Sequence, residues 1–172
     1  MANPKAKSSM SLRGVDDPSG QSILAEHHSN ELFVAIVGPA GAGSGTAAKR
    51  IEAFFVDDYQ YEAVIIKASA LIRGAAINLG MDVPAEDARK SLASITMMQD
   101  RGDDLRQGNF DGGREDHSEV ARYILRQVSL ERARMQGAKF NDDGEVEPDG
   151  KKRVYIIDSL RHPAEAHLLR RV

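Results

Sequence analysis

Residues 31–46 read ELFVAIVGPAGAGSGT, so that an apolar run passes directly into a glycine-rich loop. The run Glu31–Val37 is apolar on both faces, which is typical of a central strand in a parallel sheet covered by helices. After the loop, apolar residues recur at helical spacing and predict a helix over about Gly45–Val56. The expected beginning of the domain is therefore a strand, a glycine loop and a helix.

The glycine-rich loop is the strongest chemical signal in the chain. Glycines allow backbone N–H groups to turn inward around an anion, because no Cβ obstructs its approach. The helix that follows adds the positive end of its dipole and its unpaired N–H groups. The predicted phosphate-binding residues of the loop are Gly38, Gly41, Ala42, Gly43, Ser44, Gly45 and Thr46.

This loop departs from the P-loop consensus of Gly, four residues, Gly, Lys and then Ser or Thr. Gly38 and Gly43 have the required separation, but Ser44 stands at the lysine position and Gly45 at the hydroxyl position. Thr46 supplies a hydroxyl one residue later. Because the lysine normally neutralises the β- and γ-phosphates, we expect binding through backbone amides without efficient phosphoryl transfer.

Two other interpretations of the loop remain open. In a dinucleotide fingerprint the third glycine would fall on Thr46, and the second strand ends in Lys67 where an acid is expected. The loop would otherwise be a flexible turn between strand and helix.

The rest of the chain alternates predicted helices and strands, which indicates a parallel sheet. The fold class is α/β, a three-layer P-loop NTPase-like sheet with helices on both faces. Residues 1–30 are predicted to be a flexible arm with a short helical turn near 23–27, and residues 31–172 a domain incomplete at its C-terminus. The further predicted elements are a strand Tyr61–Lys67, helices over 69–80 (capped by Ser69), 84–108 and 116–135, an exposed loop over 137–152, a strand Val154–Asp158 and a helix Pro163–Arg171.

Further candidate ligands follow the predicted strands. Asp158 closes an apolar strand, which is the position at which P-loop proteins place an acid that holds Mg²⁺ directly or through water. Asp158 and Thr46 are therefore the predicted Mg²⁺ ligands. The alternative is that Asp158 forms an Asx turn or a helix cap. Arg161 follows at the carboxyl edge of the sheet, where open α/β sheets bind ligands. Its side chain either contacts phosphate or is solvated. Lys67 and Arg73 flank the same expected edge as second-ligand contacts.

Gln99 and Arg106 share one face of a predicted helix. A glutamine side chain can hydrogen-bond a base or sugar, and an arginine side chain can bind phosphate through two hydrogen bonds. A charged helix on the protein surface explains the same pattern equally well. His162 is interpreted as structural, because no metal-ligand spacing surrounds it.

The overall composition excludes several classes of protein. With 23 Lys and Arg against 26 Asp and Glu, the chain has no general electrostatic footprint for nucleic acid or membranes. It contains no cysteine, which excludes disulfides and thiolate-ligated metal sites. Neither a bilayer-spanning run nor a secretory signal is present in the sequence, so we expect a cytoplasmic protein.

Four segments in order, ELFVAIVGPAGAGSGT, VIIKASALIR, MMQDRGDDLR and VYIIDSLRHPAEAHLLRRV, carry a resemblance over residues 31–172. They resemble the N-terminal P-loop region of bacterial anti-phage deoxycytidylate deaminases, and are also similar to nucleotide-kinase and phosphomevalonate-kinase patterns. The resemblance implies a regulatory region that binds ATP, GTP or a deoxynucleotide with Mg²⁺. It also implies a homo-oligomeric parent with an inhibitory RNA or protein partner. A separate C-terminal zinc domain would then deaminate deoxycytidine nucleotides and deplete the phage nucleotide pool.

Three functional hypotheses follow. The first is a regulatory nucleotide-binding module that is not itself catalytic. The second is a small nucleotide or phosphometabolite kinase in which Lys67 or Arg161 replaces the absent lysine. The third is a protein-interaction module with a vestigial loop, contacting its partner through the arm or the helix over 116–135.

Overall fold

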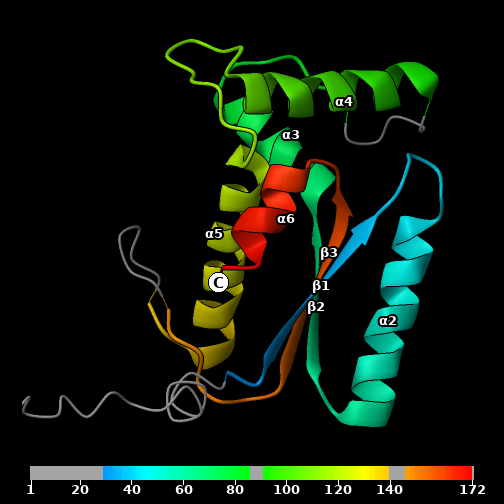
Figure 1. Ribbon diagram of the computed structural model, residues 1–172, viewed down its shortest axis with the longest axis vertical. Helices are drawn as coiled ribbons and strands as arrows, with labels where there is room; N and C mark the ends of the chain where they lie inside the picture. The colour runs from blue at the N-terminus through cyan, green and yellow to red at the C-terminus, as the bar shows by residue number, and fades with distance from the viewer. Residues whose placement is uncertain (1–28, 86–90, 140–145, 172) are drawn as a thin grey trace, which may run out of the picture.

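The computed structural model describes residues 29–85, 91–139 and 146–171 (Figure 1). The proposed arm over 1–30, apart from its last two residues, and the helical turn near 23–27 lie outside the described residues. The elements in chain order are β1 (Glu31–Val37), α2 (Ser44–Tyr59), β2 (Glu62–Lys67), α3 (Ala68–Asn78), α4 (Leu92–Gln107), α5 (Glu119–Gln136), β3 (Arg153–Leu160) and α6 (Pro163–Leu169).

The three strands form a parallel sheet in the order β1-β3-β2. The prediction that Glu31–Val37 is a central strand is wrong, because β1 pairs with β3 alone within the described chain and leaves Val37 71% exposed. The central place belongs to β3, in which seven of the eight residues are buried. Both segments are apolar, and it is the pairing of β3 on both sides that buries it.

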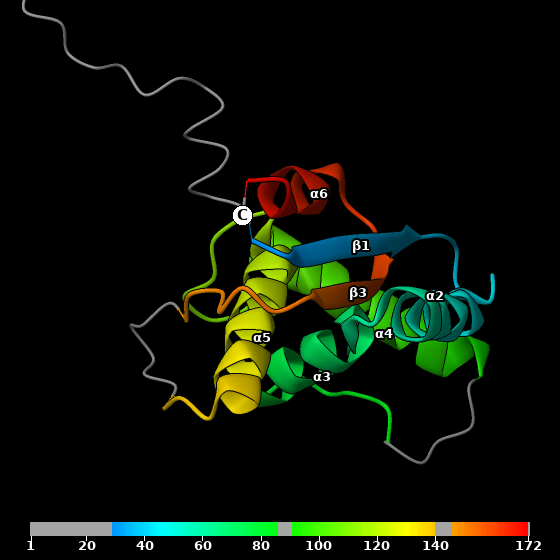
Figure 2. The ribbon, with the colours of Figure 1, turned by 90° about the horizontal axis from the view of Figure 1, so that it is seen from below.

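Helices cover both faces of this sheet, as predicted (Figures 1 and 2). On one face Val154 and Ile156 of β3 pack against Ala48 of α2. The alternate residues Tyr155 and Ile157 point into a larger core formed with α3, α4, α5 and α6. Period-two alternation along one buried strand thus produces the three layers.

Three helix starts differ from the prediction, and α5 begins at Glu119 instead of about Asp116. Helix α3 follows β2 without a connecting loop, so its N-cap is the extended Lys67 and not Ser69. Helix α4 begins at Leu92 and not near Pro84, because Ser91 and Ser94 form a reciprocal capping box at that point. The loop expected over 137–152 has no helix or strand in its described part.

A network of ion pairs occupies the amino-terminal edge of the sheet. Arg153 is fully buried and donates to both carboxylate oxygens of Asp149, at 2.6 and 2.7 Å. These hydrogen bonds lower the pKa of Asp149 to about 2. Glu31 pairs with Arg132 of α5 at 2.6 Å and with Arg153 at 3.4 Å, and therefore ties β1 to both β3 and α5.

Among the described residues, no helix has the length and apolar character that crossing a membrane requires.

The ion-pair network gives a stability prediction. Glu31→Gln leaves two largely buried guanidinium groups without their shared carboxylate, so the free energy of unfolding should fall by about 3 kcal/mol. The matched control is Glu62→Gln, because Glu62 also pairs with Arg153 but has a side chain 53% exposed. Its loss should be at most about 1 kcal/mol. Urea unfolding of both variants measures the difference, and equal losses would contradict the account.

Candidate functional site

The glycine loop, defined as Gly38–Thr46, alternates in backbone conformation. Gly41 and Gly43 have φ values of +86° and +83°, whereas Ala42 and Ser44 do not have positive φ. Alternation of this kind is the backbone pattern of nests, in which successive N–H groups turn toward one side. The turn is held by a hydrogen bond of 3.1 Å from the Ala42 N–H to the Pro39 carbonyl.

The N-terminus of α2 opens directly from this loop. Its N-cap is Gly43, which has no side chain to cap the helix, and the Gly43 carbonyl accepts the N–H groups of Thr46 and Ala47 at 2.9 and 3.0 Å. The N–H groups of Ser44 and Gly45 have no hydrogen-bond partner within the described chain. Free donors and the helix dipole therefore point in the same direction.

Parallel pairing brings the end of β3 to this helix start. Asp158 is opposite Ile36 of β1 and Lys67 of β2 in the strand register. Its side chain is largely buried, and a methyl group at Gly45 would lie 3.8 Å from its Oδ2 atom. The structure thus places the predicted acid beside the first turn of α2.

Ser159, which no sequence pattern indicated as a site residue, contacts both Asp158 and the glycine loop. Its hydroxyl donates to Oδ1 of Asp158 at 2.8 Å, and its Oγ lies 3.3 Å from Oγ of Ser44. Ser159 also has a φ of +78°. A serine after a strand-ending aspartate carries no sequence signal for either feature.

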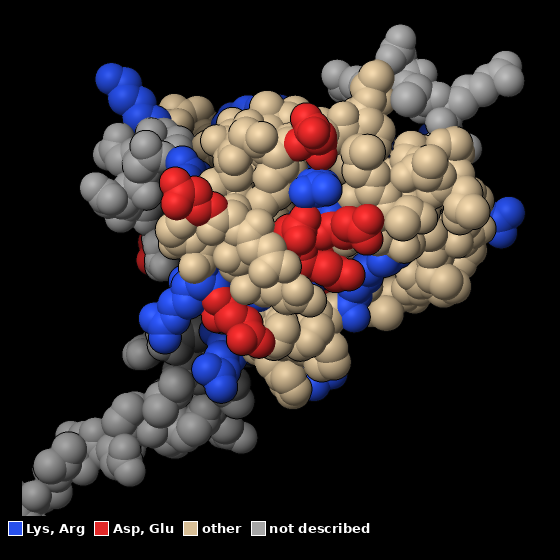
Figure 3. Space-filling view, turned by 90° about the horizontal axis from the view of Figure 1, so that it is seen from above, with Lys and Arg blue, Asp and Glu red and all other residues tan. Residues whose placement is uncertain are grey.

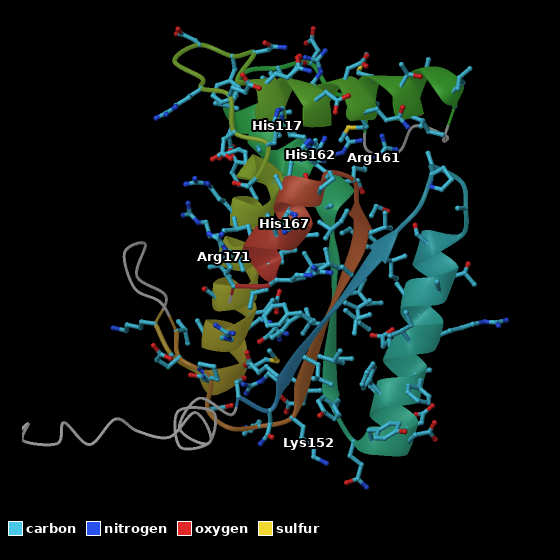
Figure 4. The ribbon with its side chains drawn as sticks, in the orientation of Figure 1. His117, Lys152, Arg161, His162, His167 and Arg171 are labelled. Atoms are coloured by element: carbon cyan, nitrogen blue, oxygen red, sulfur yellow. The ribbon has the colours of Figure 1, made fainter. Side chains whose placement is uncertain are left out.

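Two cationic side chains at the carboxyl edge have no partner among the described residues. Lys67 ends β2 and Arg161 follows β3, and both are exposed. Neither side chain has a hydrogen bond or ion pair with another described residue. Figure 4 shows Arg161 on the side of the sheet that faces α4. Lys67 and Arg161 thus follow the carboxyl ends of their strands, at the edge of the sheet where Asp158 lies.

Of the other predicted second-ligand contacts, Arg106 and Arg73 have protein partners. Arg106 is 5% exposed, and its Nη2 pairs with the fully buried Glu165 of α6 at 2.7 Å while its Nη1 binds Asp103 at 3.0 Å. Its guanidinium therefore holds α4 against α6 and does not face the glycine loop. Arg73 donates to the carbonyl of Pro84, and Gln99 is half-buried on α4.

The segment after Arg161 is organised as a helix cap. Nδ1 of His162 accepts the N–H of Ala164 at 3.2 Å, and Oε2 of Glu165 accepts the N–H groups of Arg161 and His162, each at 3.0 Å. The ring of His162 also stacks on that of His117, with 4.5 Å between centroids (Figure 4). These contacts agree with the structural interpretation of His162.

The outer face of α4 is acidic. In Figure 3 carboxylates gather over this helix around a basic side chain. Asp103 and Asp104 pair with Arg106 and Arg101, respectively.

Comparison with protein-family models, curated proteins and solved structures found no match to this chain.

The loop conformation makes opposite predictions for two neighbouring glycines. Gly43→Ala places a Cβ at positive φ and should lower the free energy of unfolding by about 1 kcal/mol. Gly45→Ala lies in the helix, where the added methyl makes only ordinary contact with Asp158, so stability should stay equal or rise by up to about 1 kcal/mol. Urea unfolding compares the two variants, and the reverse order would show that the loop has another conformation.

Proposed function

We propose that this chain is a regulatory P-loop domain that binds the phosphates of a nucleoside triphosphate or deoxynucleotide at the glycine loop. One observation carries the proposal. The alternating φ values at Gly41 and Gly43 lead into an uncapped helix beside the buried carboxylate of Asp158. An anion at this point would gain free N–H donors and the α2 dipole without displacing a protein side chain.

The charges near the loop support binding without a lysine. Lys67 and Arg161 supply positive charge at the same edge, and hydroxyl groups of Ser44 and Thr46 lie in the first turn of α2. The strand order also differs from the dinucleotide-binding order, in which the first two strands are adjacent; here β3 lies between β1 and β2. The acid-bearing strand is thereby next to the loop-bearing strand.

Magnesium fits this donor set as a companion of the phosphates. The described residues contain no group of three His, Cys, Asp or Glu side chains suited to a metal ion. Mg²⁺ does not need one, because it binds through one or two carboxylates together with substrate phosphates and water. Asp158 and Thr46 are the residues that would hold it, and the cation would neutralise phosphate charge.

The regulatory role rests on the resemblance to anti-phage deoxycytidylate deaminases and on the missing lysine. A cysteine-free chain lacks the thiolate ligands of a zinc deaminase centre, so deamination would belong to a separate domain of a longer, oligomeric, cytoplasmic parent. Nucleotide binding here would then control that domain, alongside an inhibitory RNA or protein.

A kinase is the second candidate, and Lys67 favours it. Lys67 is in register with Asp158 and has no side-chain partner among the described residues. Lys67 would therefore supply the ammonium group of the consensus lysine, whose position in the loop is occupied by Ser44. Phosphoryl transfer from ATP to an added nucleotide would support this candidate, whereas binding without turnover supports the regulatory domain.

Titration with ATP, GTP, dCTP and dCMP, each with and without Mg²⁺, tests the proposal. We expect at least one nucleotide to bind by calorimetry without turnover. At about 100 times its Kd it should stabilise the folded chain by about 2.7 kcal/mol. Gly43→Asp should weaken binding by at least about tenfold, because it sets a carboxylate against the phosphates.

Gly112→Asp is the matched control. Gly112 also has positive φ (+70°) and free space around it, but it lies between α4 and α5. This variant adds the same charge and similar strain and should bind as the wild type does. Absence of binding by every nucleotide, or equal binding by Gly43→Asp and the wild type, would contradict the proposal.

A further inference from the structure

The outer face of α2 is open to solvent. Figure 1 shows α2 by itself on one side of the sheet, with α5 and α6 on the other. Its inner side packs through Ala48, Ile51 and Phe55 into the small core with β3. Helical spacing directs a second set of residues away from the sheet. All of them are exposed, and they define the outer face of α2: Lys49, Arg50, Ala53, Phe54, Asp57 and Asp58.

The acidic residues of this face are placed against the dipole of their own helix. Asp57 and Asp58 lie in the last turn of α2, where the negative end of the dipole disfavours carboxylates, and that turn contains no basic residue to offset them. Neither carboxylate has a hydrogen bond or ion pair with another described residue. A cation supplied by a partner would therefore relieve an unfavourable local charge.

Phe54 is the apolar centre of the outer face. It is 49% exposed, yet its ring contacts those of Phe55 and Tyr59, with 5.6 and 5.0 Å between centroids. A side chain that is fixed before binding loses little conformational entropy when a partner covers it. Large aromatic side chains are also the type that most often carries the binding energy of an interface.

The charges on either side of Phe54 are complementary to themselves under two-fold symmetry. Arg50 precedes Phe54 by four residues and Asp58 follows it by four, so that all three lie along one ridge of the helix. A two-fold axis through Phe54 would set a second α2 antiparallel to the first. Arg50 of each copy would then face Asp58 of the other, and the two Phe54 rings would meet at the axis.

We propose that the outer face of α2 is a self-association surface, on which a second copy of this chain docks antiparallel about a two-fold axis near Phe54. A single pair of helices buries a small area, so the dimer is weak and reversible. The inference does not rest on the proposed function, because the glycine loop lies at the N-terminus of α2, about 14 Å along the helix from Phe54.

Sedimentation velocity of the full chain, from micromolar to millimolar concentration, tests this surface. The wild type should dimerise, and Phe54→Ala should weaken the dimer by at least about tenfold. Ile77→Ala is the matched control, since Ile77 is 54% exposed on α3, and it should dimerise as the wild type does. A wild type that stays monomeric throughout, or a Phe54→Ala variant that dimerises equally well, would overturn the inference.

Two charge reversals test the antiparallel register. Arg50→Asp sets like negative charges against each other across the axis, and Asp58→Arg sets like positive charges, so each variant alone should be monomeric. Mixed in equal amounts, the two variants are complementary and should form a heterodimer. A mixture that stays monomeric would overturn the register and with it the inference.

Two further measurements keep these outcomes distinct from misfolding and from the proposed function. Asp58→Arg should not lower the melting temperature, because a cation in the last turn of α2 agrees with the helix dipole. Both reversal variants should bind nucleotide with the affinity of the wild type. If no nucleotide binds while the mixed variants still associate, the proposed function fails and this inference stands.

Discussion

Parallel pairing between β1 and the buried strand β3 is the interaction on which the candidate site depends. Because the two strands run in the same direction, the loop that leaves β1 and the polar residues that end β3 reach the same edge of the sheet. Asp158 thereby comes to lie beside the first turn of α2, next to Gly45. The bulge at Ser159 is the local adjustment within this pairing, and it joins the strand end to the loop through Ser44. An antiparallel β3 would carry these groups to the opposite edge.

The ion pairs that stabilise the fold lie apart from the charged groups of the candidate site. At the amino-terminal edge Glu31, Arg132 and Arg153 satisfy one another, which stabilises a buried network but leaves little for a ligand. Above the sheet, Arg106 is bound to Glu165 and holds α4 against α6. The described cations left at the carboxyl edge lie around a loop that has no lysine of its own. In the proposed function an anion there would be held mainly by N–H groups, which would separate nucleotide binding from phosphoryl transfer.

The sequence was sufficient to predict the loop, the number of strands and the helices on both faces, because apolar runs and helical periodicity are local signals. It could not decide which strand is central, since ELFVAIV and VYIID are both apolar and strand order is set by tertiary packing. The ion pair between Arg106 and Glu165 could not be predicted either, because the two residues are 59 positions apart in the sequence. The left-handed Ser159 was missed for a related reason. Its conformation is imposed by the β1–β3 pairing and not by the residue itself.

Backbone amide chemical shifts during titration with ATP and Mg²⁺ measure directly whether the N–H groups of the glycine loop hold the phosphates. We predict the largest shifts at Gly41, Gly43, Ser44 and Gly45, with smaller ones at Asp158 and Ser159. Shifts concentrated on α5 or at the amino-terminal edge of the sheet, with the glycine loop unmoved, would show that the phosphates do not bind at this loop.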